Sequence, residues 1–369
     1  MNKLQNKRVV VAMSGGVDSS VAAALLVEQG YDVVGMMMRL WSEPSQGAAA
    51  PVNRCCTPDQ MADARRVADH LNIPFYVIDV QDYFRKTIVQ FFIDEHENGR
   101  TPNPCIECNR EIRFTHLLNH ALALDADYLA TGHYARVQAT PDGYHLLKGV
   151  DDSKDQSYVL HVLSQQQLAQ VLFPVGDYEK TVVRELATTF NLPVAAKQDS
   201  QDLCFLGDGD YRRFLRDYSD KVNTTGPIID QDGVTIGQHN GLAFYTIGQR
   251  KGLGVSTSEP VFVLKKEKRN NVLVVGPREM LGQQSLIARN VNWISGTAPQ
   301  EPIHAQVKVR YKARGIEAEV VGLGNGRMQV QFKEPVTGIT PGQGAVCYAG
   351  ERCLGGGIIA DFNAQGSFA

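Results

Sequence analysis

The sequence predicts an α/β fold with a doubly wound parallel sheet, followed by a small connecting domain and a C-terminal β-barrel. In the first half, short apolar runs alternate with segments whose apolar residues recur at helical spacing, which is typical of βαβ units. After about residue 207 the pattern changes to short strands punctuated by glycine, and from about 282 to 360 only strand and turn signals remain. We therefore expect domains over residues 1–207, 208–280 and 281–369.

The first domain has the clearest pattern. Thr57 can cap a helix, Pro58 suits its first turn and Gln60 can complete the capping box. In a sheet of this kind, ligands bind at the carboxyl ends of the strands. The expected strands cover residues 8–13, 32–38, 75–80 and 127–131, and the expected helices lie near 18–29, 57–71, 83–97 and 110–124.

The later elements are shorter. In the last domain, Gly324-Asn325-Gly326 predicts a hairpin turn and Pro341-Gly342 predicts another turn. For the connecting domain we expect a helix near 209–219 and strands at 227–229, 242–246, 260–264 and 272–275.

The composition is that of an ordinary globular protein, with 43% hydrophobic residues, 21% charged residues and a net charge of −3. A nucleic-acid partner would therefore need a local basic patch. We see no signal peptide and no apolar run near the roughly 20 residues of a membrane span. The seven cysteines, an odd number without a secretory signal, predict reduced thiols in a cytoplasmic protein with no membrane segment.

The loop Ser14–Ser20 lies between a predicted buried strand and a predicted helix. Two glycines allow the backbone to approach an anion, and the first helical N–H groups favour negative charge. The hydroxyls of Ser14, Ser19 and Ser20 add donors, and Asp18 could hold a metal ion beside the phosphates. The loop matches neither the Walker nor the dinucleotide pattern. It resembles the pyrophosphate loop of ATP pyrophosphatases, although a glycine-rich helix start without a ligand would look similar.

Three cysteines are candidates for sulfur or metal chemistry. Cys105 and Cys108 form a Cys-x-x-Cys motif in a proline-constrained turn before a predicted helix, close to Arg110 and Arg113, so we expect a lowered thiol pKa. By itself the motif fits a redox pair, half a zinc site or a pair of cluster ligands. Cys204 has an equally simple interpretation as a small buried apolar residue.

Taken together, the motifs resemble those of the tRNA-specific 2-thiouridylase family over essentially the whole chain. The resemblance implies ATP-dependent 2-thiolation of the wobble uridine of tRNA, in which the C2 oxygen is adenylated and sulfur then displaces AMP. The matching segments are Ser14–Ser20, Thr101–Pro104 with Cys108-Asn109, Ala130–Tyr134, Lys154–Ser157, Asp199-Ser200 with Cys204-Phe205, Gly248–Leu253 and Leu354–Ile358.

The same resemblance implies binding residues. A Mg²⁺ ion would sit on Asp18, and the tRNA partners would be those for lysine, glutamate and glutamine; we expect a monomer. The implied ATP-binding residues are Ala12, Met13, Ser14, Gly15, Gly16, Val17, Asp18, Ser19, Met38 and Gly132. The implied contacts to tRNA or its flipped base are Asn103, Pro104, Cys105, Lys154, Asp155, Gln156, Arg310 and Tyr311.

For the sulfur step the resemblance leaves two routes open for the catalytic cysteines Cys105, Cys108 and Cys204. In one, Cys204 carries a persulfide from a cysteine desulfurase or sulfur relay protein, Cys108 attacks it, and a Cys108–Cys204 disulfide results. In the other, all three thiolates hold a 4Fe–4S cluster whose open iron binds hydrosulfide. The second route is suggested by Cys105, which stands where many members have aspartate.

Other features are less specific. The segment His304–Arg314 has cations at every second position apart from Gln306, so a strand there would present them on one face, either to phosphates or simply to solvent. Arg250-Lys251 and Lys265–Arg269 could extend this basic track. We expect a mobile loop between Trp41 and Cys55, an accessory role for Cys55 and Cys56, and core or rim positions for Cys347 and Cys353.

Two further classes of function are compatible with parts of the sequence. The first is another ATP pyrophosphatase, either a tRNA cytidine thiolase or an amide-forming synthetase, although the synthetases need no thiols. The second is a non-catalytic tRNA-binding iron–sulfur protein, which has no use for a pyrophosphate loop. Pyrophosphate release that requires tRNA distinguishes these classes.

Overall fold

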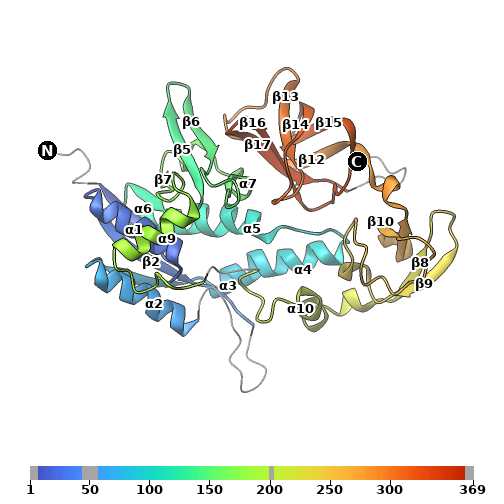
Figure 1. The fold of residues 1–369 in the computed structure, drawn as a ribbon, viewed down its shortest axis with the longest axis horizontal. Helices are drawn as coiled ribbons and strands as arrows, with labels where there is room; N and C mark the ends of the chain where they lie inside the picture. Colours follow the sequence, from blue (N-terminus) through green and yellow to red (C-terminus); the bar gives the residue numbers. More distant parts are fainter. Residues whose placement is uncertain (1–6, 44–56, 199–202, 362–369) are drawn as a thin grey trace.

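The computed structural model describes residues 7–43, 57–198 and 203–361. The predicted loop at 41–55, with Cys55 and Cys56, and the motif residues Asp199-Ser200 lie largely or wholly outside these ranges. The first domain, drawn from blue to light green in Figure 1, contains a sheet in the order β3-β2-β1-β4-β7. Every pair in this sheet is parallel, as the sequence predicted. Its strands are β1 (Arg8–Ala12), β2 (Asp32–Arg39), β3 (Phe75–Asp79), β4 (Tyr128–Ala130) and β7 (Val171–Leu172).

The central strand β1 is covered on both faces. Because side chains alternate along a strand, Val9 and Val11 join an apolar cluster with helices α1 (Val17–Glu28), α2 (Pro58–His70) and α9 (Lys180–Thr189). Val10 joins a second cluster, which includes residues of η2 (Cys108–Leu117) and α6 (Leu118–Leu122). This arrangement confirms the doubly wound architecture.

Two long helical segments pass through π-helical stretches. One runs without a break through α3 (Gln81–Phe84), η1 (Arg85–Val89) and α4 (Gln90–Glu97). The other runs through α5 (Pro104–Glu107), η2 and α6.

The expected start of the second segment near residue 110 was wrong. Asn103 caps the helix by accepting a hydrogen bond from the Cys105 N–H at 3.1 Å, and Pro104 occupies the first helical position. Cys105 and Cys108 therefore lie within the first helical turns and not in a preceding loop.

The middle domain is a four-stranded sheet in the order β10-β11-β8-β9, packed beside α10 (Tyr211–Tyr218). The strand expected at 242–246 is wrong: Leu242–Phe244 form a 3-10 turn, η4. The apolar run was interpreted as a strand, but these side chains are buried in the core of the middle domain from a turn. The sequence analysis also missed β9. The other elements are β8 (Gly226–Ile229), β9 (Thr235–His239), β10 (Phe262–Glu267), β11 (Val272–Gly276) and the 3-10 turns η3 (Asp220–Asn223), η5 (Lys268–Asn270) and η6 (Arg278–Leu281).

The last domain is a closed β-barrel, as predicted. Its strands follow the order β12-β15-β14-β13-β16-β17, and a further β12–β17 pairing closes the barrel. The predicted hairpin joins β14 to β15 through Asn325 and Gly326, which both have positive φ. The strands are β12 (Gln283–Trp293), β13 (Ile303–Lys308), β14 (Ile316–Gly324), β15 (Arg327–Val336), β16 (Gly344–Ala349) and β17 (Arg352–Ile359). Cys347 and Cys353 are buried in β16 and β17.

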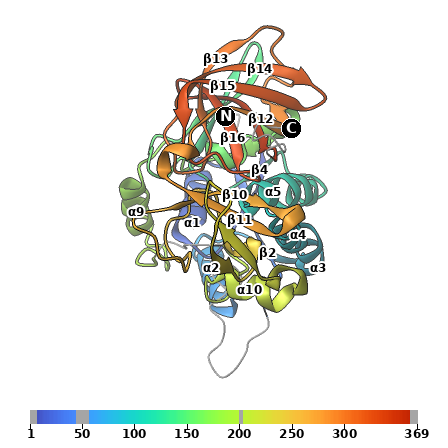
Figure 2. The same ribbon diagram turned by 90° about the vertical axis from the view of Figure 1, so that its right-hand side faces the viewer.

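The first domain contributes a hairpin to the barrel sheet. Strands β5 (Ala135–Thr140) and β6 (Gly143–Lys148) pair with each other, and β6 pairs with β17 through Leu146 and Cys353. Beside this hairpin, the short helices α7 (Ser157–Leu160) and α8 (Gln165–Leu168) precede β7. Figure 2 shows the barrel strands at one end of the molecule and the helices of the first domain below them.

A second junction involves the segment before α5. The Thr101 N–H donates to the Pro341 carbonyl at 2.9 Å, and Gln343 Nε2 donates to the Thr101 carbonyl at 2.7 Å. The chain that leads into the Cys-x-x-Cys motif is thus held against a barrel turn. No helix in the described ranges is long and apolar enough to cross a membrane.

Asn103→Ala should weaken the start of the motif helix. Loss of a cap costs about 1 kcal/mol, so the Cys105 amide should exchange its hydrogen roughly fivefold faster. Peptide-level hydrogen exchange measures this rate. Asn103→Asp keeps an acceptor oxygen and serves as the control; equal exchange in all three proteins would contradict the assigned cap.

Candidate active site

The loop between β1 and α1 is shaped by two glycines. Gly15 has a φ of 70°, and a Cβ at this position would lie 2.3 Å from the Gln60 carbonyl oxygen. Only glycine fits there without moving backbone atoms. Gly16 is the N-cap of α1 with extended backbone, so the first N–H groups of the helix face the loop.

Serine hydroxyls close the loop from within. The Ser14 N–H donates to Ser19 Oγ at 3.2 Å, and Ser19 Oγ donates to the Gly16 carbonyl at 3.2 Å. Ser20 is fully buried and donates to the same carbonyl at 2.8 Å. Ser20 therefore supports the loop, whereas Ser14 is exposed at its mouth.

Asp18 is already held by two donors. Lys180 Nζ, at the start of α9, lies 2.6 Å from Asp18 Oδ1, and the Tyr134 hydroxyl donates to the same oxygen at 2.7 Å. A magnesium ion on this oxygen would have to compete with the Lys180 ammonium. Lys197 also lies at the loop, where its Nζ donates to the Gly15 carbonyl at 2.8 Å and pairs with the carboxylate of Asp63 at 2.5 Å.

The sequence analysis missed Lys180 and Lys197 because both lie far from the loop in the sequence and belong to no recognised pattern. Both are brought to the loop by the fold of the first domain. An ammonium group beside a phosphate loop is suited to bind phosphate oxygens.

The other predicted ATP-binding residues gather at the same strand ends. Ala12 and Met13 lie at the end of β1, Met38 near the end of β2, and Gly132 just after β4. A Cβ on Gly132 would lie 2.7 Å from the Ser19 nitrogen, so this glycine lets the β4 loop touch the start of α1. Val17 is buried in the core beneath.

The three candidate cysteines differ in exposure. Cys105 is exposed, Cys108 is buried and Cys204 is half-buried. Cys108 belongs to an apolar cluster between the first and middle domains, and Cys204 packs against the same cluster. Arg113 Nη1 lies 3.6 Å from Cys108 Sγ, as the sequence predicted, whereas Arg110 lies 3.8 Å from the carboxylate of Glu107.

The arrangement of these cysteines bears on the cluster route. Within residues 7–43, 57–198 and 203–361, no three His, Cys, Asp or Glu side chains are grouped so that they could hold a metal ion. The choice between the cluster and the persulfide route stays a prediction. Cys108 and Cys204 are both free in this structure, and the disulfide that the resemblance implies would form only after sulfur transfer.

Tyr311 brings two of the predicted base-binding residues together. Burial, together with the nearby Asp155 and Cys105, raises the pKa of Tyr311 to about 12. The Tyr311 ring also lies 5.8 Å from the ring of Tyr158, which is fully buried. Cys105 thus lies at the junction of the first domain and the barrel. Asn103 and Pro104 precede it at the helix start.

The side chains of Asp155 and Gln156 form hydrogen bonds with other groups of the protein. Asp155 is 5% exposed and accepts hydrogen bonds from Gly149 N and from Ser157 N and Oγ. Its Oδ2 also lies 3.3 Å from Lys308 Nζ. Gln156 Oε1 accepts from the Tyr134 N–H at 3.0 Å. Lys154 is half-buried at the same turn.

The expected basic strand over 304–314 was wrong beyond Lys308, where β13 ends. Arg310 instead joins domains: Nε donates to the Gly338 carbonyl at 2.8 Å, and Nη2 donates to Thr340 Oγ1 and to the Ile247 carbonyl. Lys312 and Arg314 are exposed beyond the strand. The alternation of charged and apolar residues did not predict the strand correctly, because it continues past Lys308, where β13 ends.

Comparison with known families matches all three parts of the chain. Residues 7–208 match the model described as tRNA methyl transferase HUP domain. Residues 212–277 match the tRNA methyl transferase PRC-barrel domain, and residues 283–359 match the aminomethyltransferase beta-barrel domain.

Similar full-length proteins carry one name, tRNA-specific 2-thiouridylase MnmA. The protein of Magnetococcus marinus is 48% identical, covering 96% of this chain and 99% of its own. That of Geobacter metallireducens is 46% identical, covering 97% and 98%, and that of Chloroflexus aggregans is 47% identical, covering 95% and 98%. The chain therefore belongs to the tRNA-specific 2-thiouridylase family.

Proposed function

We propose that this protein forms 2-thiouridine at the wobble position of tRNA, using ATP to activate the C2 oxygen. The observation that carries the proposal is that one domain holds both a loop built for phosphates and a thiol pair, Cys108 and Cys204, in a chain of this family. We place the reaction in the cytoplasm, where thiols stay reduced, and propose that the protein acts as a monomer.

In the first step, the C2 oxygen attacks the α-phosphorus of ATP, the bond to the β-phosphate breaks, and pyrophosphate leaves as uridine N3 loses its proton. The N–H groups at the start of α1 and the ammonium groups of Lys180 and Lys197 would stabilise the charge on the phosphates. Mg²⁺, when bound, would neutralise further phosphate charge, with Asp18 as the carboxylate of the loop.

In the second step, we propose that the Cys108 thiolate attacks the Sγ of a Cys204 persulfide. The sulfur–sulfur bond breaks, hydrosulfide leaves, and a Cys108–Cys204 disulfide forms. Hydrosulfide then attacks C2, the C2–O bond breaks and AMP departs. The proton of the sulfur is transferred to N3, which had lost its own proton in the first step, and neutral 2-thiouridine results. A cysteine desulfurase or relay protein supplies the persulfide, and an external dithiol reduces the disulfide. Arg113 beside Cys108 would favour the thiolate.

The substrate base would reach this site from an anticodon loop placed at the junction of first domain and barrel. A base must leave its stack before C2 can be attacked. The N-terminal turn at Asn103–Cys105 and the neighbouring Tyr311 offer polar and aromatic groups for a splayed base. We propose the tRNAs for lysine, glutamate and glutamine as substrates.

The proposal is tested by incubating the protein with ATP, a persulfide donor and unmodified tRNA, followed by nucleoside mass spectrometry and a pyrophosphate assay. We expect 2-thiouridine and tRNA-dependent pyrophosphate release. A product of 2-thiocytidine would indicate the cytidine thiolase, and tRNA binding without pyrophosphate release would indicate a non-catalytic protein.

Lys180→Met should slow tRNA-dependent pyrophosphate release by about 100-fold, because it removes a cation that we place on the phosphates. The initial rate of pyrophosphate release measures this effect. Lys221→Met provides a matched control, since Lys221 also pairs with a carboxylate, Glu97 at 2.9 Å, but on an exposed surface. Equal rates for the two variants would contradict the role of Lys180.

Cys108→Ser and Cys204→Ser should each abolish 2-thiouridine while tRNA-dependent pyrophosphate release continues, because adenylation does not need the thiols. Cys105→Asp, which restores the residue common in the family, should still thiolate tRNA. Iron analysis accompanies the assay. Iron bound to the wild type and lost together with thiolation in Cys105→Asp would contradict the persulfide route.

A further inference from the structure

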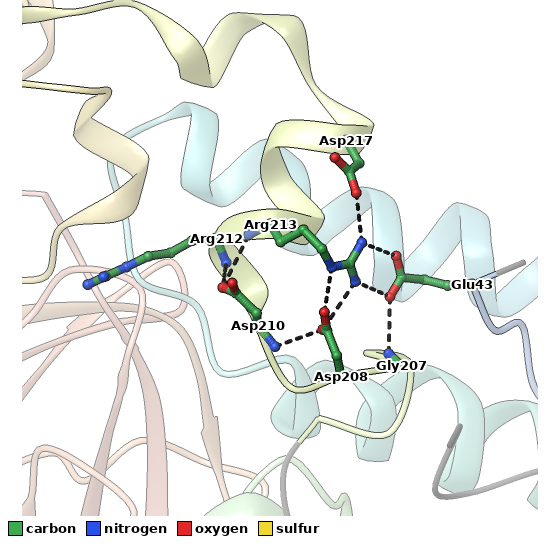
Figure 3. A network of polar contacts seen from close by, with 7 residues as sticks. All are labelled: Glu43, Gly207, Asp208, Asp210, Arg212, Arg213 and Asp217. Carbon is green, nitrogen blue, oxygen red and sulfur yellow. Dashed lines mark hydrogen bonds and ion pairs between the residues drawn. The ribbon is translucent and has the colours of Figure 1, made fainter. Parts of the chain in front are cut away.

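Arg213 is the centre of a polar network that joins three stretches of chain (Figure 3). From α10 it binds Glu43 in a two-pronged ion pair, with Nη1 3.0 Å from Oε1 and Nη2 2.7 Å from Oε2. It also binds Asp208 through Nε at 2.6 Å and Asp217 through Nη1 at 2.7 Å. Asp210 caps the helix that carries it. The guanidinium is thus shared among three carboxylates.

Glu43 is the buried member of this network, with 7% of its surface exposed. Its Oε2 also accepts a hydrogen bond from the Gly207 N–H at 3.0 Å. Glu43 follows the end of β2, and Gly207 lies a few residues after Cys204. One carboxylate therefore ties the backbone next to Cys204 to the carboxyl end of the parallel sheet.

The other side of the Cys204 segment is held by aromatic packing. Phe205 is buried, and its ring lies 5.3 Å from that of Phe92 and 5.6 Å from that of Phe214. Phe214 is the residue after Arg213 on α10. Helix α10 therefore holds the segment at two points. The ring of Phe214 packs against the ring of Phe205, and Arg213 binds Glu43, which accepts a hydrogen bond from the Gly207 N–H.

We propose that Glu43 and Arg213 are positioning residues for Cys204, which act in the sulfur step and not in adenylation. The inference rests on the proposed function, since it gives these residues a role in presenting the Cys204 sulfur to Cys108. The planar guanidinium fork matches the carboxylate in a way that lysine does not. With Glu43 held in this way, its hydrogen bond to the Gly207 N–H restrains the chain that follows Cys204.

Three variants test the proposal. Glu43→Ala removes the acceptor for Gly207, Glu43→Gln keeps an oxygen acceptor but loses the charge, and Asp217→Asn removes an Arg213 contact that lies within α10 alone. We would measure 2-thiouridine formation, tRNA-dependent pyrophosphate release and the rate at which iodoacetamide alkylates Cys204, with Cys105 as the internal reference.

Glu43→Ala should lower the thiolation rate about 10- to 100-fold, since small misplacements of reacting groups have effects of this size. Glu43→Gln should show a smaller loss, and Asp217→Asn should behave as the wild type. In Glu43→Ala the alkylation of Cys204 should change relative to Cys105, while pyrophosphate release stays within about twofold.

Each other outcome has a definite meaning. Normal thiolation and unchanged Cys204 alkylation in Glu43→Ala would overturn the inference. Parallel losses of thiolation and pyrophosphate release would also overturn it, because the pair would then serve the whole domain. If the wild type itself forms no 2-thiouridine, the proposed function fails, and the alkylation ratio still decides whether Glu43 positions Cys204.

Discussion

The burial of β1 on both faces is the constraint on which the rest of the structure depends. Val9, Val10 and Val11 are fully buried, and they pack against helices on opposite sides of the sheet. Apolar burial is the main source of stability, so this strand must be covered on both faces. The loop that connects β1 to α1 therefore reaches the surface at the carboxyl end of the strand and not across its buried faces. The loop Ser14–Ser20, Gly132 and the strand-end residue Met38 all lie at the carboxyl ends of the strands.

Polar residues that the sequence analysis predicted as tRNA contacts form bonds between the domains of the protein. Asp155 reaches Lys308 of the barrel, and Arg310 bonds to carbonyls of the barrel and the middle domain. Buried charges are stable only when paired and hydrogen-bonded, and these groups meet that condition within the protein. In this structure, Asp155 and Arg310 thus connect the barrel to the rest of the protein.

The sequence was sufficient for the features that local patterns determine. The parallel sheet, the placement of the loop Ser14–Ser20 between a strand and a helix, the Asn325-Gly326 hairpin and the barrel follow from periodicity and turn residues. The start of the Cys105 helix was missed because proline was interpreted as part of a turn, although it fits the first helical position. The contacts of Lys180 with Asp18 and of Arg213 with Glu43 could not be predicted, because they join segments that are distant in sequence.

The hairpin β5–β6 has a consequence for the order of synthesis. Strand β6 pairs with β5 on one side, but its partner on the other side, β17, lies near the far end of the chain. While a ribosome is still making the barrel, the completed first domain exposes the edge of β6, and an open edge invites pairing with other chains. A fragment that ends near residue 208 would keep that edge permanently. Aggregation of such a fragment would then result from the absence of β17 beside β6 and not from misfolding of the parallel sheet.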